Sequence, residues 1–159
     1  MPNPDSEQAP DIPRVIAPPP LIFLVPLVLG VAVGRWIPIP LLPRAWAWGV
    51  GAVCLGLSGL VISAVRAFRR ARTRPEPWKP TTALVTDGPY RFTRNPMYLG
   101  FALVYVGVTL LVNTLWPLLL LPVVLTVIHF LVIRREERYL ERKFGDDYRA
   151  YLRTVRRWI

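Results

Sequence analysis

The sequence predicts an all-α fold: an integral membrane protein with about four transmembrane helices and a C-terminal amphipathic helical tail. First, 53% of the 159 residues are hydrophobic. Second, charge is segregated: Glu76 and Asp87 are the only acidic residues between Asp11 and Glu136, and residues 97–133 contain no Asp, Glu, Lys or Arg. Water-soluble helices rarely leave so long a stretch without charge, because some face of each helix must meet water. A bundle of membrane helices accounts for both observations.

Residues 1–20 are polar and rich in proline. They lack the basic stretch and small-residue cleavage site of a signal peptide. We therefore expect residues 1–20 to be a disordered N-terminal tail and residues 21–159 to form a single membrane domain.

The first two apolar runs are expected to span residues 21–37 and 45–65. The first contains Pro26, which predicts a kink or a tilt. The second would be about 31 Å long, enough to cross the hydrocarbon core. Its small residues predict close helix packing, and they are Gly49, Gly51, Gly56 and Gly59.

Two further spans are predicted over residues 97–112 and 115–133. The linker between them is so short that they should form a helical hairpin. Pro117 falls in the early turns of the last span, where proline is best tolerated. His129, the single histidine, lies in that span. An intramembrane polar residue suggests either a hydrogen bond between helices or a role in a cavity.

Basic residues gather in the loop at 66–80 and in the tail from residue 134, whereas Arg35 and Arg44 alone fall in the opposite loop. The positive-inside rule then places both termini in the cytoplasm, and we expect a bacterial inner (plasma) membrane. Topology explains most of the net charge of +10. The chain has no basic soluble domain that could bind nucleic acid, and its lone Cys54 offers no metal cluster.

The tail over residues 134–159 has the periodicity of an amphipathic helix. Gly145 with Asp146 should end one helix and begin the next. Such a tail could lie on anionic lipid or fold back over the ends of the spans. One apolar face is predicted to contain Leu140, Phe144, Tyr148, Tyr151, Leu152 and Val155.

Polar groups that could carry chemistry occur in two segments, residues 84–100 and 134–137. In the first, Asp87-Gly88-Pro89 predicts a turn, and Asn95-Pro96 predicts a helix start with Asn95 as its cap. The hairpin should bring both segments to one membrane face. Their polar side chains are Tyr90, Arg91, Arg94, Asn95, Tyr98, Glu136 and Glu137.

The run GPYRFTRNPMYLG resembles the signature Gly-x-Tyr-(x)3-Arg-His-Pro-x-Tyr of the isoprenylcysteine carboxyl methyltransferase family and the related phospholipid methyltransferases. The pair Glu136-Glu137 and the later segment FGDDYRAY resemble that family's tail, so the likeness extends over residues 84–158. The family's histidine is Asn95 here, which cannot titrate. Thr82 occupies a position that is often histidine in the eukaryotic enzymes. These departures bear on the prenylcysteine substrate and leave the implied cofactor-binding residues unchanged.

The resemblance implies an S-adenosylmethionine-dependent methyltransferase that holds its cofactor between the last spans and the C-terminal helices, without a Rossmann domain. Accordingly, the sequence has no dinucleotide-binding glycine motif. The implied cofactor-binding residues are Leu84, Val85, Gly88, Tyr90, Glu136 and Glu137. The implied catalytic residues are Arg94 and Asn95, which could hold an anionic group, and Tyr98.

The implied acceptor is a lipid-like or prenylated small molecule or protein that enters between helices. A carboxylate acceptor is already ionised at neutral pH, whereas an amine would need to lose a proton, and no base stands out. Two other functions stay open. One is an NADPH-dependent membrane reductase of the sterol-reductase type, which the paired glutamates disfavour. The other is a small non-enzymatic membrane protein that binds anionic lipid.

Overall fold

The computed structural model describes residues 11–13 and 15–158. Every secondary-structure element assigned within these residues is a helix. Residues 1–10 and 14 of the predicted tail therefore lie outside the described residues. The elements are α1 (Pro19–Trp36), α2 (Arg44–Leu57), α3 (Leu60–Arg70), the 3-10 helix η1 (Gly88–Arg91), α4 (Pro96–Val112), α5 (Leu115–Val127), the π-helical η2 (Ile128–Ile133) and α6 (Arg134–Thr154).

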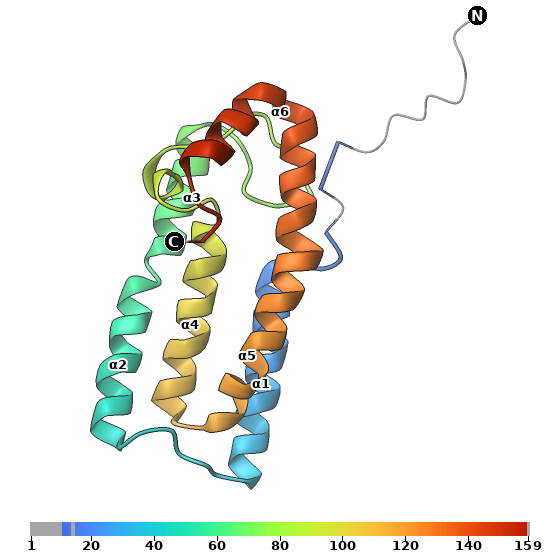
Figure 1. The fold of residues 1–159 in the computed structure, drawn as a ribbon. Coiled ribbons are helices and arrows are strands. Elements are labelled where there is room, and N and C mark those ends of the chain that lie inside the picture. The colour runs from blue at the N-terminus through green and yellow to red at the C-terminus, as the bar shows by residue number, and fades with distance from the viewer. Residues whose placement is uncertain (1–10, 14, 159) are drawn as a thin grey trace, which may run out of the picture.

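The helices form an up-and-down bundle (Figure 1). α1 packs mainly on α5, and α2 packs mainly on α4. The helical stretches 19–36, 44–70 and 115–154 are long enough and contain an apolar segment long enough to cross a membrane, which in the third ends at Ile133, and α4 is a shorter apolar helix. The predicted all-α membrane architecture is confirmed. The second stretch continues beyond its predicted end to Arg70 and is interrupted between α2 and α3, where Ser58 Oγ donates to the Leu55 carbonyl.

Close contacts between the helices occur at small residues, but only in part at the predicted ones. A Cβ atom on Gly30 would lie 2.6 Å from the Pro117 backbone nitrogen, so α1 and α5 touch backbone to backbone there. Between α2 and α4, a Cβ atom on Gly51 would lie 3.0 Å from the Gly107 carbonyl oxygen, so these two helices also approach closely at small residues. The packing prediction was wrong for Gly49 and Gly56, because a Cβ at either position meets open space.

Gly30→Ala should lower the free energy of unfolding by about 1–3 kcal/mol, because the new methyl group must push the Pro117 backbone away. Thermal unfolding of the detergent-purified protein measures the effect. Gly49→Ala is the matched control, since its methyl group points into open space. It should leave stability unchanged or slightly raised through better helix propensity. Equal destabilisation by both substitutions would contradict the assigned packing.

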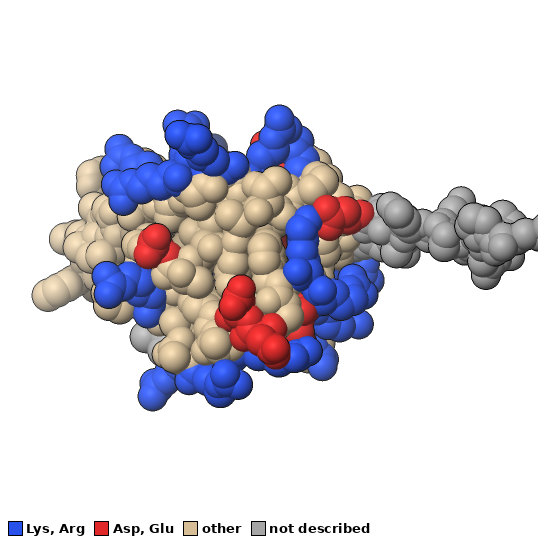
Figure 2. All heavy atoms as spheres, turned by 90° about the horizontal axis from the view of Figure 1, so that it is seen from above, with Lys and Arg blue, Asp and Glu red and all other residues tan. Residues whose placement is uncertain are grey.

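The even number of apolar stretches brings the start of α1, the end of α3, the segment 71–95 and α6 together at one end of the bundle (Figure 1). We call it the basic end. Viewed directly, Lys and Arg occupy much of its margin, with fewer acidic groups among them (Figure 2). At the other end Asn113, with φ 56°, accepts hydrogen bonds from the Leu41 and Leu42 amides through its side-chain oxygen.

The C-terminal tail folds back over the basic end. α5, η2 and α6 form one continuous helical stretch up to Gly145. There φ 52° and ψ −119° break the helix and redirect the chain, as glycine permits. Tyr148 and Tyr151 beyond the break are buried. Of the two arrangements left open by the sequence, the tail therefore adopts the one that covers the spans.

Two local features differ from expectation. Asp11 accepts hydrogen bonds from Tyr139 Oη and Lys143 Nζ on α6, so this part of the predicted tail contacts the domain. The His129 ring packs edge-on against Phe130 at 4.8 Å between centroids. Within the described residues the His129 side chain makes no hydrogen bond to another helix, so the proposed interhelical bond is not seen there.

Candidate functional site

A cavity at the basic end, here called the main cavity, is bounded by both polar segments that the sequence singled out. It has about 730 Å³ of space free of protein atoms, part of it open to solvent. Its walls come from the end of α3, the segment 74–85, η1, the start of α4, and both halves of α6. The lining residues are Pro13, Phe68, Arg74, Pro75, Glu76, Pro77, Thr81, Ala83, Leu84, Val85, Tyr90, Arg94, Asn95, Met97, Tyr98, Glu136, Tyr139, Leu140, Tyr148 and Tyr151.

The apolar wall of the main cavity is built on α3. Val85 and Tyr90 are buried against Ala64 and Ala67, and the Phe68 ring meets the Tyr90 ring edge-on at 5.5 Å. Gly88 starts η1 at φ 61°, a conformation that glycine adopts without strain. This turn places Tyr90 in the wall. Gly88 itself does not line the cavity, so it shapes the site instead of contacting its contents.

Two carboxylates line the main cavity: Glu76, which pairs with Lys79 at 3.2 Å, and Glu136. Glu136 lies in the first turn of α6, beyond the last spanning segment, and Tyr98 Oη donates a hydrogen bond to Glu136 Oε1 at 2.6 Å. Desolvation raises the pKa of Glu136 to about 7; the Tyr98 hydrogen bond opposes this rise and the neighbouring Glu137 charge adds to it. At neutral pH this carboxyl group is therefore close to half ionised, and a bound cation would favour its charged form.

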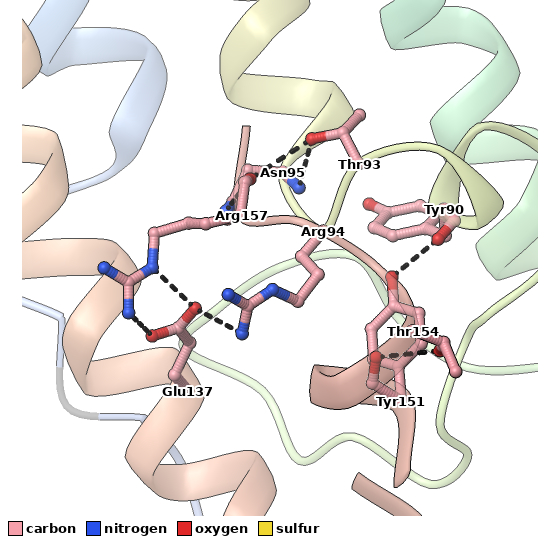
Figure 3. Close-up of polar contacts among 8 residues, drawn as sticks. All are labelled: Tyr90, Thr93, Arg94, Asn95, Glu137, Tyr151, Thr154 and Arg157. Carbon is pink, nitrogen blue, oxygen red and sulfur yellow. Dashed lines mark hydrogen bonds and ion pairs between the residues drawn. The ribbon is translucent and has the colours of Figure 1, made fainter. Parts of the chain in front are cut away.

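Glu137 points elsewhere, because adjacent residues on an α-helix are about 100° apart around its axis. Its carboxylate pairs with Arg94 Nη1 at 3.1 Å and accepts a forked pair of bonds from Arg157, Nε at 3.0 Å and Nη2 at 2.7 Å (Figure 3). The Arg94 and Glu137 side chains are only 14% and 16% exposed, so solvent screens this pair weakly. Glu137 thus joins the two arginines and does not line the main cavity.

The chain beyond α6 is tied to the start of α4 by backbone carbonyls. Asn95 Nδ2 donates to the Arg157 carbonyl at 2.8 Å (Figure 3). The Arg94 amide donates to the Arg156 carbonyl at 3.0 Å. Tyr151 Oη donates to the Tyr90 carbonyl at 2.7 Å. Asn95 is the N-cap residue of α4, as predicted, but its side chain makes no capping hydrogen bond, because its amide holds the C-terminal segment. Pro96 does begin α4.

Comparison with known proteins now identifies the family. A family model described as "Phospholipid methyltransferase" matches residues 45–147, more than half of the chain. The chain belongs to the phospholipid methyltransferase family. The matched region holds α2 to α4, the hairpin, both glutamates of α6 and most of the main cavity. The family match and the apolar helices together make the chain an integral membrane protein of a methyltransferase family.

Two relatives each match part of this chain. The "Protein-S-isoprenylcysteine O-methyltransferase" of Schizosaccharomyces pombe is 39% identical over 72 residues, which are 45% of this chain and 30% of the yeast protein. An "Uncharacterized protein" of Haemophilus influenzae is 43% identical over 63 residues, which are 40% of this chain and 100% of that protein. No solved structure matches.

In this phospholipid methyltransferase family member, the structure brings most of the proposed site residues to one cavity. Those that line it are Leu84, Val85, Tyr90, Arg94, Asn95, Tyr98 and Glu136, whereas Gly88 and Glu137 do not. The sequence did not indicate Tyr139, Tyr148 and Tyr151 as residues of the cavity. Tyr148 and Tyr151 were assigned to an apolar helix face, and Tyr139 was not singled out. Their phenols were the available signal, because a buried tyrosine needs a hydrogen-bond partner. Burial raises the pKa of Tyr148 and Tyr151, so both remain protonated donors.

Proposed function

We propose that this protein is an S-adenosylmethionine-dependent methyltransferase that binds its cofactor in the main cavity and methylates a lipid-like or isoprenylated acceptor. The observation that supports it most is that the segment from Leu84 to Tyr98 and the Glu136 turn of α6, 38 residues beyond Tyr98, meet around one cavity. We further propose that the basic end faces the cytoplasm, as the positive-inside rule requires.

The donor set of the main cavity fits this cofactor. Glu136 can accept hydrogen bonds from its amino group or ribose and complement its positive charge. Arg94 can bind its carboxylate: the Arg94 Nε atom is buried and has no hydrogen-bond partner among the described residues. Leu84, Val85 and Phe68 provide an apolar wall for the adenine. A buried orphan donor beside an acidic and an apolar wall suits a ligand with a cationic, an anionic and an aromatic part.

Methyl transfer places modest chemical demands on the chain. The bound cofactor supplies a methyl group on a sulfonium, which an acceptor atom displaces directly. The residues of the cavity then have to hold two reactants in line and exclude water. Tyr98 fixes the Glu136 carboxylate. Asn95 holds the Arg157 carbonyl, and Tyr151 holds the Tyr90 carbonyl, so the walls keep their spacing.

The test is calorimetric titration of S-adenosylmethionine into the detergent-purified protein, with NADPH titrated in parallel. We expect saturable binding of S-adenosylmethionine and none of NADPH. Leu84→Trp should abolish binding by filling the cavity, whereas Val53→Trp, on the exposed face of α2, should not change it. Binding of NADPH alone would favour a reductase. Binding of neither ligand would favour the non-enzymatic function.

A further inference from the structure

A second cleft, here called the arginine cleft, adjoins the main cavity and shares Arg94 and Tyr148 with it. It has about 790 Å³ of space free of protein atoms, part of it open to solvent. It lies between the first half of α6 and the part of the chain that folds back beyond Gly145. The charged residues that line it are Arg94, Arg134, Glu137, Arg138, Glu141 and Arg157.

Both acidic groups of the arginine cleft are already engaged. Glu137 is shared by Arg94 and Arg157, and Glu141 pairs with Arg149, which lies outside the cleft. Arg134 and Arg138 have no acidic partner among the residues that the structure describes. The cleft therefore has an excess of positive charge that the protein itself leaves uncompensated, and an anion would lower its electrostatic energy.

Arg134 and Arg138 are held in place by contacts that leave their charge available. The Arg134 guanidinium carbon lies 5.5 Å from the centroid of the Phe130 ring, a cation–π contact. Arg138 Nε donates to the Arg134 carbonyl at 3.1 Å, which leaves both of its terminal amino groups for a ligand. An arginine that is already positioned loses less conformational freedom when it binds a phosphate oxygen.

The position of the cleft relative to the membrane defines the source of the anion. Arg134 follows directly after η2, the end of the last apolar stretch, and is exposed. We therefore expect the start of α6 to lie at the level where the phosphate groups of a leaflet begin. Basic pockets at this depth bind anionic lipid head groups. Leu152 on the opposite wall adds an apolar contact.

We propose that the arginine cleft binds the phosphate group of an anionic lipid from the leaflet at the basic end, with Arg134 and Arg138 as its main ligands. The site is separate from the main cavity, and it does not depend on methyl transfer. The side chains of Arg94 and Tyr148 would separate a lipid in the cleft from the main cavity.

The test measures phospholipid binding to the full chain by native mass spectrometry, comparing phosphatidylglycerol with phosphatidylcholine. The double variant Arg134→Ala/Arg138→Ala should weaken phosphatidylglycerol binding about 10-fold or more, because it removes the charge-assisted hydrogen bonds that both arginines would donate to the phosphate. Arg142→Ala/Arg153→Ala is the control, because it removes the same charge from exposed positions of α6 outside the cleft. It should weaken binding less than about 2-fold, because neither side chain lines the cleft and exposed charges contribute little.

A parallel titration with inorganic phosphate separates the two sources of the ligand. Phosphate binding that needs Arg134 and Arg138, without any preference for phosphatidylglycerol, would overturn the lipid assignment and leave a site for free phosphate. Equal weakening of lipid binding by the two double variants would show diffuse attraction to the surface and overturn the cleft. Unchanged thermal unfolding of both double variants establishes that they fold.

Discussion

Replacing Glu136 with Gln is expected to weaken S-adenosylmethionine binding about 10- to 100-fold at pH 8, because a hydrogen bond to a charged group contributes about 1.5–3 kcal/mol. The substitution keeps the size of the side chain and a carbonyl oxygen for the Tyr98 hydroxyl. Calorimetric titration measures the affinity. Glu141→Gln is the matched control, since Glu141 lies on the same helix outside the main cavity. Unchanged affinity in Glu136→Gln would remove this carboxylate from the cofactor site.

The same substitution should also remove a pH dependence. The ionised form of Glu136 is the one that accepts bonds from the cofactor, and its pKa in the free protein is raised to about 7. Binding by the unmodified protein should therefore strengthen from pH 6 to about pH 7.5, below the range in which the α-amino group of the cofactor loses its proton. Glu136→Gln should lack this rise. A parallel pH profile of both proteins would contradict the assignment.

Stability should respond to Glu136 in the opposite sense. The pKa of Glu136 is raised in the folded protein above its ordinary value of 4.5. Between these two values the folded state holds a proton that the unfolded state has lost, so stability falls as pH rises through this window. Glu136→Gln removes this penalty, and the free protein should melt at a higher temperature at pH 8. A carboxylate kept at a cost to stability is typical of a functional group.

Glu137→Gln is expected to lower the free energy of unfolding by about 2–4 kcal/mol, because it leaves Arg94 and Arg157 facing each other without a counter-charge. This is somewhat below the loss for a fully buried pair, since Arg157 is 36% exposed. For a chain of this length the midpoint of thermal unfolding should fall by about 5–10 °C.

The control for Glu137 is again Glu141→Gln, which breaks an exposed pair with Arg149 and should change stability by about 0.5 kcal/mol or less. A second variant tests the cause: Glu137→Gln/Arg157→Gln should recover part of the lost stability, because it removes one of the two unpaired charges. If the stability loss of the double variant equals the sum of the losses of Glu137→Gln and Arg157→Gln measured separately, Arg157 is stabilised by other contacts. That result would contradict the bridging role of Glu137.

The membrane fold could be predicted from the sequence because it depends on composition over long stretches. The charge-free run from 97 to 133 leaves no soluble alternative, and the hairpin then follows from the short linker. The interruption at Ser58 could not be predicted in this way, because only two residues separate the end of α2 from the start of α3. Hydropathy averages over so short an interruption.

Within the candidate site, the positions of the motif residues that lie at the starts of α4 and α6 could be predicted from the sequence. Tyr98 and Glu136 meet as expected. Glu136 and Glu137 could not be told apart, because their roles depend on which way α6 is rotated about its axis. The contribution of Tyr148, Tyr151 and Arg157 depends on the direction in which the chain leaves Gly145, and a glycine alone leaves that direction open.

The bond from Asn95 to the Arg157 carbonyl joins residues 62 positions apart, and it has a consequence for the order of biosynthesis. A ribosome makes the Leu84–Tyr98 wall long before residues 156 and 157. The first three apolar stretches can therefore leave the ribosome while the enclosure around Glu136 is still unfinished. Competence to bind a ligand would then be acquired in a single late event, after membrane insertion, and premature termination before residue 156 would produce an inserted but inert bundle.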